Sequence, residues 1–366
     1  MKKHRITIVA YYFGKKLGAG SFMENLYPPL MKRLQENNYE ITLITNSYFM
    51  RDCGDKLPAD IQIHRPKLLE KSVLSKFYFL FLFGNTPYVQ QADCVLFSID
   101  SIIGWKMNNV IAIIHDLNEF AMQDKLGKYR TWFRKRMIEN TITKARKIIV
   151  ISHFVKQQIK TYLPKLSAGK DIEVIHSGAV LPNNLDNVLD DREPFFVVVG
   201  RIDPKAKYLY EAVRVFLAYQ KNHPEFRLKI AGEANDFCRQ DAAAFLQYIN
   251  DIPGIDYVGH VSNEELDLLY RKATATLFLS KLEGFGLPVL ESFARGCPVI
   301  TNGNNEVNDE LTSGMDIKIY DDEIENEAVI NEKINKINQI DRNKLIAVAA
   351  SFSWEKTAEK YMKILK

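Results

Sequence analysis

Residues Ser280–Thr301 read SKLEGFGLPVLESFARGCPVIT, and the rest of the chain is best interpreted outward from this stretch. Gly284 and Gly286 let the backbone turn sharply and allow a ligand to approach without meeting a Cβ atom. Pro288 suits the first position of a helix, which we expect over Val289–Arg295 with a glycine cap behind it. An apolar strand follows. The stretch therefore predicts a glycine turn at the start of a short helix.

Two carboxylates flank this turn. The N–H groups of Phe285, Gly286 and Leu287 are expected at the helix start, where unpaired donors and the helix dipole favour an anionic group such as phosphate. Glu283 and Glu291 would repel phosphate but suit sugar hydroxyls. A diphosphate flanked by two polyhydroxylated sugars has this pattern, so the stretch predicts a nucleotide-sugar site. The alternative is a tight loop that only joins a strand to a helix.

Two glutamates separated by seven residues around Gly-Phe-Gly-Leu-Pro resemble the signature of the retaining glycosyltransferases of family 4, the glycosyl transferases group 1, which have the GT-B fold. The resemblance implies that Glu283 lies by the donor sugar and that Glu291 holds the ribose hydroxyls. It also implies that the backbone between them receives the diphosphate.

Short apolar runs rich in Val and Ile alternate with longer helical patterns, which predicts an α/β fold with two doubly wound, Rossmann-like domains. The resemblance implies that these domains face a cleft. The strands expected in the first domain are Ile6–Tyr12, Ile41–Thr45, Cys94–Ile99, Val110–Ile114 and Lys147–Ile151. Those expected in the second are Phe195–Val199, Arg227–Ala231, Ala275–Leu279 and Pro298–Thr301.

The 366 residues suit two domains of ordinary size. We expect an N-terminal acceptor-binding domain over 1–180 and a C-terminal nucleotide-sugar-binding domain over 181–350, joined by the polar stretch Pro182–Pro194. The resemblance implies that a last helix, 351–366, crosses back to the first domain. Its expected anchors are Phe352, Trp354 and Tyr361. The alternative is an ordinary terminal helix on the second domain.

The composition is that of a globular protein, and no segment approaches the ~20 apolar residues that span a bilayer. The N-terminal MKKHRITIVAYYF is interpreted as a first strand and not as a signal peptide. The four cysteines are scattered without paired spacing, which is typical of free thiols in a reducing cytosol. No metal or other cofactor is expected, since no Asp-x-Asp pair stands at a predicted strand end.

The charge is distributed unevenly. Residues 1–180 hold 27 Lys and Arg against 15 Asp and Glu, whereas residues 181–366 hold 22 against 30. From 125 to 170 there are 13 basic residues and one acidic residue, Glu139, interleaved with Trp132, Phe133 and Met137. This pattern favours a helix at an anionic membrane surface. Nucleic acid is the rival partner, but no recognisable nucleic-acid motif accompanies the charge.

The run Phe77–Phe83, FYFLFLF, is strongly apolar and lies next to Lys71 and Lys76. A buried helix or strand explains it most simply. The functional alternative is a patch against a membrane or a lipid-linked acceptor.

Two N-terminal motifs add candidate site residues. Gly18 and Gly20 lie in a loop that we expect before a helix over Phe22–Glu36, and the resemblance places this loop opposite the donor diphosphate. His115 ends the strand Val110–Ile114, at the sheet edge where such folds bind ligands. The resemblance implies an active-site role for His115 beside the reacting sugar and a supporting role for Asp116. A satisfied polar residue at a strand end is the alternative.

Arg201 and Lys207 follow the first strand of the second domain. A planar guanidinium fork and a mobile ammonium together suit a departing diphosphate, and the resemblance gives the pair this role. Lys205 could replace Lys207, and solvated surface charge is the alternative for all three.

We therefore expect a cytoplasmic, membrane-peripheral, retaining and metal-independent glycosyltransferase. It would move a hexose or deoxyhexose from a nucleotide-diphosphate sugar to a saccharide acceptor, lipid-linked or anionic, in bacterial surface polysaccharide synthesis. The catalytic set would be His115, Glu283, Arg201 and Lys207. Two alternatives stay open at this point: a sugar-nucleotide epimerase or phosphorylase of the same fold, and a non-catalytic partner that only binds a nucleotide-sugar.

Overall fold

The computed structural model describes residues 3–13, 18–98, 103–104, 106–121, 128–182, 192–234 and 238–365, with the backbone alone at 128–130. The chain divides into two compact units. The N-terminal unit comprises Met1–Gly178 together with Ser353–Lys366, and the C-terminal unit comprises Ala179–Phe352. Most of the expected linker Pro182–Pro194 lies outside the described residues, from 183 to 191.

The N-terminal unit is built on a seven-stranded parallel sheet in the order β3-β2-β1-β4-β5-β6-β7. Its strands are β1 (His4–Ala10), β2 (Tyr39–Thr45), β3 (Gln62–His64), β4 (Cys94–Ser98), β5 (Val110–Ile114), β6 (Lys147–Val150) and β7 (Ile172–Val174). Every residue of β4 and β5 is buried, which explains their unbroken apolar sequence. The order reverses between β1 and β4, and ligands bind at such switch points, beyond the carboxyl ends of the strands.

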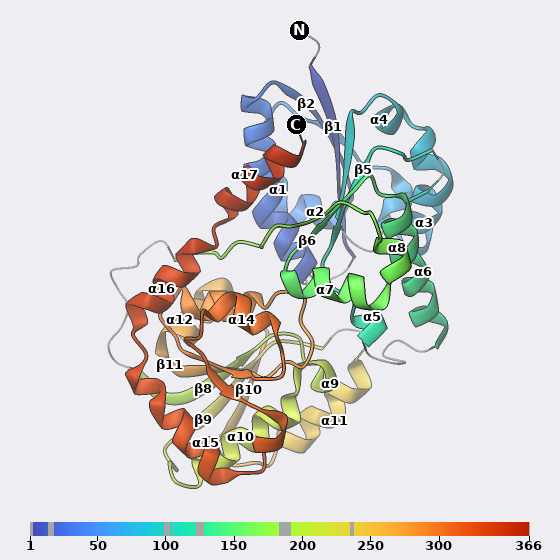
Figure 1. Ribbon diagram of the computed structural model, residues 1–366. Coiled ribbons are helices and arrows are strands. Elements are labelled where there is room, and N and C mark those ends of the chain that lie inside the picture. The colour runs from blue at the N-terminus through green and yellow to red at the C-terminus, as the bar shows by residue number, and fades with distance from the viewer. Residues whose placement is uncertain are drawn as a thin grey trace. The chain divides into compact units, whose positions relative to one another are not determined.

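Helices flank this sheet (Figure 1). They are α1 (Gly18–Glu36), α2 (Ser47–Cys53), α3 (Ser72–Phe77), α4 (Pro87–Gln90), α5 (Asn118–Ala121), α6 (Lys128–Lys144), α7 (His153–Tyr162) and α8 (Pro164–Ser167), with a π-helix, η3, over Tyr78–Leu82. Short 3-10 turns lie at Gly54–Lys56, Lys67–Glu70 and Phe83–Asn85.

The last helix, α17 (Trp354–Leu365), packs along α1 in the N-terminal unit, as the red and blue helices of Figure 1 show. Trp354 and Tyr361 are buried there, and Thr357 donates a hydrogen bond to the carbonyl of His176 at 2.9 Å. Phe352 instead belongs to the C-terminal unit, where its ring centroid lies 6.2 Å from that of Phe285. Two of the three expected anchors thus lie in the N-terminal unit.

The C-terminal unit contains a six-stranded parallel sheet in the order β10-β9-β8-β11-β12-β13. Its strands are β8 (Glu193–Val199), β9 (Arg227–Ala231), β10 (Ile255–Gly259), β11 (Ala273–Phe278), β12 (Val299–Asn302) and β13 (Ile317–Ile319). The switch point falls between β8 and β11, so the loops that follow these two strands form the expected ligand-binding edge.

The helices of this unit are α9 (Pro204–Lys207), α10 (Leu209–Gln220), α11 (Arg239–Ile249), α12 (Asn263–Lys272), α13 (Leu287–Phe293), α14 (Val307–Thr312), α15 (Glu327–Ile334) and α16 (Arg342–Ser351). One core joins α10 to the sheet through Val213, Phe216, Phe196 and Ile230. The predicted α/β class, with two doubly wound parallel sheets, is confirmed.

The predictions differ from the structure in detail. The sequence does not reveal β3, β7 and β13, because three residues at a sheet edge carry too little apolar pattern. The helix expected over Phe22–Glu36 begins four residues earlier, at Gly18. The run Phe77–Phe83 crosses from α3 through the π-helix into a 3-10 turn and is not a strand.

The four cysteines are free and buried. Among the described residues, every helix is either too short or too polar to cross a bilayer.

Candidate functional site

Two loops meet at the switch point of the C-terminal sheet. β8 and β11 are parallel neighbours, and Arg201 follows the first strand while Glu283 follows the second. The ends of the two strands line a small pocket, together with Gly200, Arg201, Lys207, Phe278 and Ser280. The topology therefore brings together residues that stand about eighty positions apart in the sequence.

Arg201 is held by the helix that follows it. Its Nη2 donates to Asp203 Oδ2 at 2.9 Å, and the two side chains are 28% and 9% exposed. Asp203 also caps α9, since its Oδ1 accepts from the backbone N–H of Ala206 at 3.2 Å. The guanidinium is thus fixed at the carboxyl end of β8.

Lys207, the last residue of α9, reaches the opposite loop. Its Nζ donates to Glu283 Oε1, and the two side chains are only 20% and 16% exposed. The ammonium also lies 5.7 Å from the centroid of the Phe278 ring. Lys205 instead pairs with Asp241 at 2.9 Å, with 70% of its side chain exposed. The structure brings Lys207 together with Glu283 and puts Lys205 on the surface.

The glycine turn leads into α13. Gly286 caps this helix with φ +103° and ψ +51°, a backbone conformation that L side chains rarely adopt. Phe285 and Gly286 are buried, and Leu287 is the first helical residue. The helix expected over Val289–Arg295 therefore starts two residues earlier and ends at Phe293, although the glycine behind it, Gly296, has the expected positive φ of 61°.

Two asparagines fasten the loop after β11. Asn305 Nδ2 donates to the carbonyl of Ser280 at 2.9 Å, and Asn302 Nδ2 donates to that of Leu279 at 3.4 Å. Both asparagines are 2% exposed, whereas Glu306, the carboxylate of the same stretch, is exposed. The sequence did not single out these asparagines, because a side-chain bond to a loop carbonyl leaves no local pattern.

Glu291 lies on α13 and accepts a hydrogen bond from a side chain of the preceding helix, α12. The hydroxyl of Tyr270, on α12, donates to Glu291 Oε2 at 3.1 Å. Arg295 adds a bond from its Nη1 to the Glu291 carbonyl at 3.0 Å and is itself held by Asp267 at 2.8 Å. Tyr270 is a further residue that sequence reasoning missed, since only the packing of α12 on α13 brings it to the carboxylate.

His115 lies at the carboxyl end of β5 in the N-terminal unit. Its Nε2 is 3.2 Å from Ser98 Oγ, and its ring stands edge-on to Phe22, with 4.6 Å between the centroids. Phe22 in turn contacts Trp354 of α17 at 5.5 Å between centroids. Asp116 Oδ1 accepts from the backbone N–H of Asn118 at 3.2 Å and so shapes the turn that follows.

Gly18 and Gly20 form the first turn of α1 and not a separate loop, which corrects the prediction. Gly18 is exposed and open, because no heavy atom lies within 4 Å of an added Cβ, while Gly20 is buried.

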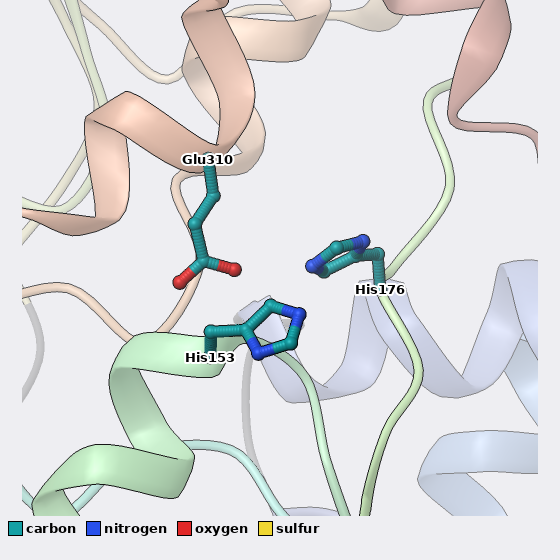
Figure 2. A group of neighbouring side chains, drawn as sticks. All are labelled: His153, His176 and Glu310. Carbon is teal, nitrogen blue, oxygen red and sulfur yellow. The ribbon is translucent and has the colours of Figure 1, made fainter.

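Two histidines of the N-terminal unit also stand close together. His153 starts α7 and His176 follows β7, with 5.8 Å between their ring centroids (Figure 2). Glu310, drawn in the same figure, belongs to α14 of the C-terminal unit. Two imidazoles are fewer than the three or four protein ligands of a typical zinc site, so we assign no metal to this pair.

Two comparisons with known proteins test the resemblance. Residues 184–349 match the family of glycosyl transferases group 1. Solved glycosyltransferases share the fold over nearly the whole chain. A glycosyltransferase from Rickettsia africae has a TM-score of 0.67 at 14% identity, covering 100% of this chain and 98% of that one. The match confirms the resemblance of residues 184–349 to the glycosyl transferases group 1, and the solved glycosyltransferases confirm the expected fold of the chain.

Individual curated relatives match this chain over only part of their length. The O-antigen chain mannosyltransferase RfbU of Salmonella typhimurium is 25% identical over 244 residues, 63% of this chain and 64% of that protein. The O-antigen chain mannosyltransferase B of Escherichia coli is 23% identical over 208 residues, 53% of each protein. The chain therefore spans about half to two thirds of the length of these relatives. WaaG, a glycosyltransferase involved in lipopolysaccharide biosynthesis, shares the fold with a TM-score of 0.66 at 13% identity, covering 99% of both chains.

Proposed function

We propose that this protein is a glycosyltransferase that moves a hexose or deoxyhexose from a nucleotide-diphosphate sugar to a saccharide acceptor. The observation that carries the proposal is the meeting of Arg201, Lys207 and Glu283 at the ends of β8 and β11. A pair of cations beside a carboxylate, at the ligand-binding edge of the sheet, suits a diphosphate joined to a sugar.

In the proposed reaction, breaking the anomeric bond leaves negative charge on the diphosphate. Arg201 is already oriented by Asp203, so it can stabilise this charge with little reorganisation. Lys207 is neutralised by Glu283 in the structure, and an incoming diphosphate would compete for its ammonium group. Glu283, released from the pair, could then accept hydrogen bonds from the donor sugar.

Glu291 would accept hydrogen bonds from the ribose hydroxyls, with its carboxylate oriented by Tyr270. Phe285, Gly286 and Leu287 would present backbone N–H groups to the diphosphate. His115 is proposed to help to position the sugar, and Gly18 and Gly20 to let α1 begin near the donor.

We propose transfer with retention of the anomeric configuration. A retaining glycosidase has two carboxyl groups across the scissile bond. Here the departing diphosphate would occupy one face, so front-face attack, with a phosphate oxygen taking the acceptor proton, is the route that we favour. We also propose that no divalent metal is required.

The acceptor is proposed to be a saccharide, lipid-linked or anionic, in the synthesis of a bacterial surface polysaccharide. Two relatives named O-antigen chain mannosyltransferases support this choice and make mannose the first sugar to test. An enzyme that glycosylates a lipid-linked acceptor would lie in the cytoplasm, on the inner face of the membrane. The basic surplus of residues 1–180 would hold it at anionic lipids.

The deciding experiment is a donor screen. The purified chain is mixed with UDP-, GDP- and dTDP-sugars, including nucleotide-linked mannose, and thermal stabilisation and slow nucleotide release are measured. One donor that both stabilises and is hydrolysed supports the proposal. Binding without hydrolysis favours an epimerase or a binding partner, and no binding at all rejects the site.

Two further measurements test the mechanism. The anomeric configuration of the product, read by NMR, should match that of the donor, and an inverted product rejects front-face attack. Turnover should persist with a chelator present. Loss of turnover that magnesium restores would show that a metal is needed.

A further inference from the structure

One segment of the N-terminal unit turns an apolar face outward. α3 continues directly into the π-helix, so residues 72–82 form one short helical rod. Its inner side is anchored, since the ring of Phe79 lies 5.0 Å from Phe97 of β4 and 5.2 Å from Tyr11, centroid to centroid. Tyr78 and Phe79 are buried. The rod is therefore held on the sheet and presents a defined outer side.

The outer side consists of large apolar side chains where a water-facing helix would carry polar ones. Val73 is 78% exposed, Phe77 is 50% exposed and Phe81 is 58% exposed, and the two phenylalanine rings stand 5.2 Å apart. Leu74 and Leu82 are also exposed. Five of the fourteen exposed large apolar side chains in the described part of the chain thus fall within ten residues, which makes a patch and not a scatter.

The border of the patch is basic. From Lys71 to Thr86 the sequence contains no Asp or Glu, and Lys71 and Lys76 are exposed. Lys76 Nζ lies 4.9 Å from the centroid of Phe133, which joins the rod to α6. The neighbour of Phe133 on that helix, Trp132, is 54% exposed. A second copy of this patch would bring lysine against lysine, whereas lipid phosphates would neutralise both.

Several side chains of α6, within the basic stretch 125–170, are already engaged inside the protein and do not add to this surface. Arg134 is paired with buried Glu119 at 2.6 Å, and Arg136 is paired with Glu139 at 2.9 Å. Met137 is buried. Of the residues that interleave with the basic side chains, Met137 thus adds nothing to the exposed surface, whereas Trp132 and the rod carry exposed apolar side chains.

We propose that the outer side of residues 73–82, with Trp132, is the surface by which this protein enters the headgroup and acyl boundary of an anionic bilayer. The rings of Phe77 and Phe81 supply the apolar contact, and Lys71 and Lys76 meet lipid phosphates. The inference deepens the membrane association proposed above, which names only the basic half of the chain.

The test measures partition of the full chain onto vesicles by co-sedimentation. Vesicles of phosphatidylcholine mixed with phosphatidylglycerol are compared with vesicles of phosphatidylcholine alone, at low and high salt. We expect binding to the anionic vesicles that weakens with salt but is not abolished by it, because apolar insertion is not screened.

The variant Phe77→Ser/Phe81→Ser should lose at least about tenfold in partition, since two aromatic side chains no longer leave water. The matched control is Tyr248→Ser/Leu268→Ser, two side chains of similar exposure in the C-terminal unit, which should bind like the wild type. Thermal melting of each variant establishes that the fold is intact.

The outcomes separate this inference from the broader association. If wild type and Phe77→Ser/Phe81→Ser bind equally and salt releases both, electrostatic association stands and insertion by the rod is rejected. If the wild type fails to bind anionic vesicles, both are rejected, irrespective of donor hydrolysis. If it forms a dimer that the same variant dissociates, the patch is an interface between two copies and the proposal is overturned.

Discussion

The buried hydroxyl of Tyr270 donates a hydrogen bond to Glu291 Oε2 across 3.1 Å, from one helix of the C-terminal unit to the next. Burial and the adjacent carboxylate raise the pKa of Tyr270 well above its ordinary value, so the phenol keeps its proton and stays a donor. The Arg295 guanidinium lies 5.7 Å from the centroid of the same ring. The bond therefore orients the Glu291 carboxylate, the group proposed above to hold the ribose hydroxyls.

Replacement of Tyr270 by Phe should therefore weaken nucleotide binding by about tenfold, because a hydrogen bond to a charged group contributes ~1.5–3 kcal/mol and only part of it acts through orientation. Calorimetry with a ribonucleoside diphosphate and with its 2′,3′-dideoxy analogue measures the effect. The loss should vanish with the analogue, which lacks the hydroxyls that Glu291 is proposed to hold.

The control is Tyr219→Phe, which removes the hydroxyl of another buried tyrosine of the same unit, hydrogen-bonded to Asn335 at 3.4 Å. It should leave both affinities unchanged. An equal loss for the ribonucleotide and the dideoxy analogue in Tyr270→Phe would mean that Tyr270 only supports the fold.

Replacement of Glu283 by Ala separates transfer from binding. The carboxylate is proposed to contact the donor sugar, so sugar transfer should fall by at least ~100-fold, a typical cost of removing one group that stabilises a transition state. Nucleoside diphosphate should bind as well as before or better, because Lys207 loses the anion that neutralises it. Initial rates measure the loss of sugar transfer, and calorimetry measures the affinity for the nucleoside diphosphate.

For comparison, Glu325→Gln removes an exposed carboxylate of the same unit, paired with Arg214 at 3.1 Å, and should change neither quantity. Unchanged turnover in Glu283→Ala would reject the role proposed for this residue.

The two lysines of α9 can be told apart by the same assay. Lys207→Ala should reduce affinity for a nucleoside diphosphate strongly and for the free nucleoside little, because the ammonium is proposed to meet phosphate. Lys205→Ala should change neither, since its exposed pair with Asp241 is of a kind that contributes ~0–1 kcal/mol to stability. A larger loss of nucleoside diphosphate affinity in Lys205→Ala than in Lys207→Ala would mean that Lys205, and not Lys207, meets the phosphate.

Gly286 can be tested for its backbone conformation. Alanine at this position would be strained at φ +103°, and its Cβ would lie 3.2 Å from Leu311 Cδ1. We expect Gly286→Ala to lose ~1–3 kcal/mol of unfolding free energy and also to weaken nucleotide binding. The control is Gly314→Ala. Its backbone is also strained, at φ +75°, but no heavy atom lies within 4 Å of the new Cβ, so it has no steric clash.

Thermal melts with and without nucleotide distinguish the two glycine variants. Gly314→Ala should lose stability but keep its affinity. Equal affinity in both variants would show that the shape of the turn after Glu283 does not matter for binding.

Much of the fold could be predicted from the sequence, because central parallel strands such as Val110–Ile114 are buried on both faces and read as unbroken apolar runs. The edge strand Gln62–His64 could not, since it is short and largely exposed. In the candidate site, Glu283 and Glu291 stand in one contiguous motif, so the sequence pattern alone predicts both. Tyr270 and Asn305 act through tertiary packing from other elements, so no spacing in the sequence points to them.

The sequence also cannot distinguish Lys205 from Lys207 as the partner of Glu283. Both lie in one four-residue helix, and only the fold decides which of them meets Glu283. The start of α1 was misplaced because glycine lowers helix propensity, whereas packing extends the helix to Gly18.

The close packing of Gly178 against the start of α17 leads to a further prediction. A Cβ added at Gly178 would lie 2.4 Å from the backbone nitrogen of Trp354 and 2.6 Å from its Cγ, so Gly178→Ala must push the start of α17 away. Overpacking of this kind costs ~1–3 kcal/mol, and we expect faster hydrogen exchange of the α17 amides together with a lower melting temperature. The control Gly54→Ala meets only the flexible end of Met50, at 3.1 Å, in a helical conformation, and should leave exchange in α17 unchanged. Because Phe22 links Trp354 to the ring of His115, the Gly178 variant should also slow sugar transfer, and normal transfer despite a loosened α17 would show that His115 does not depend on this helix.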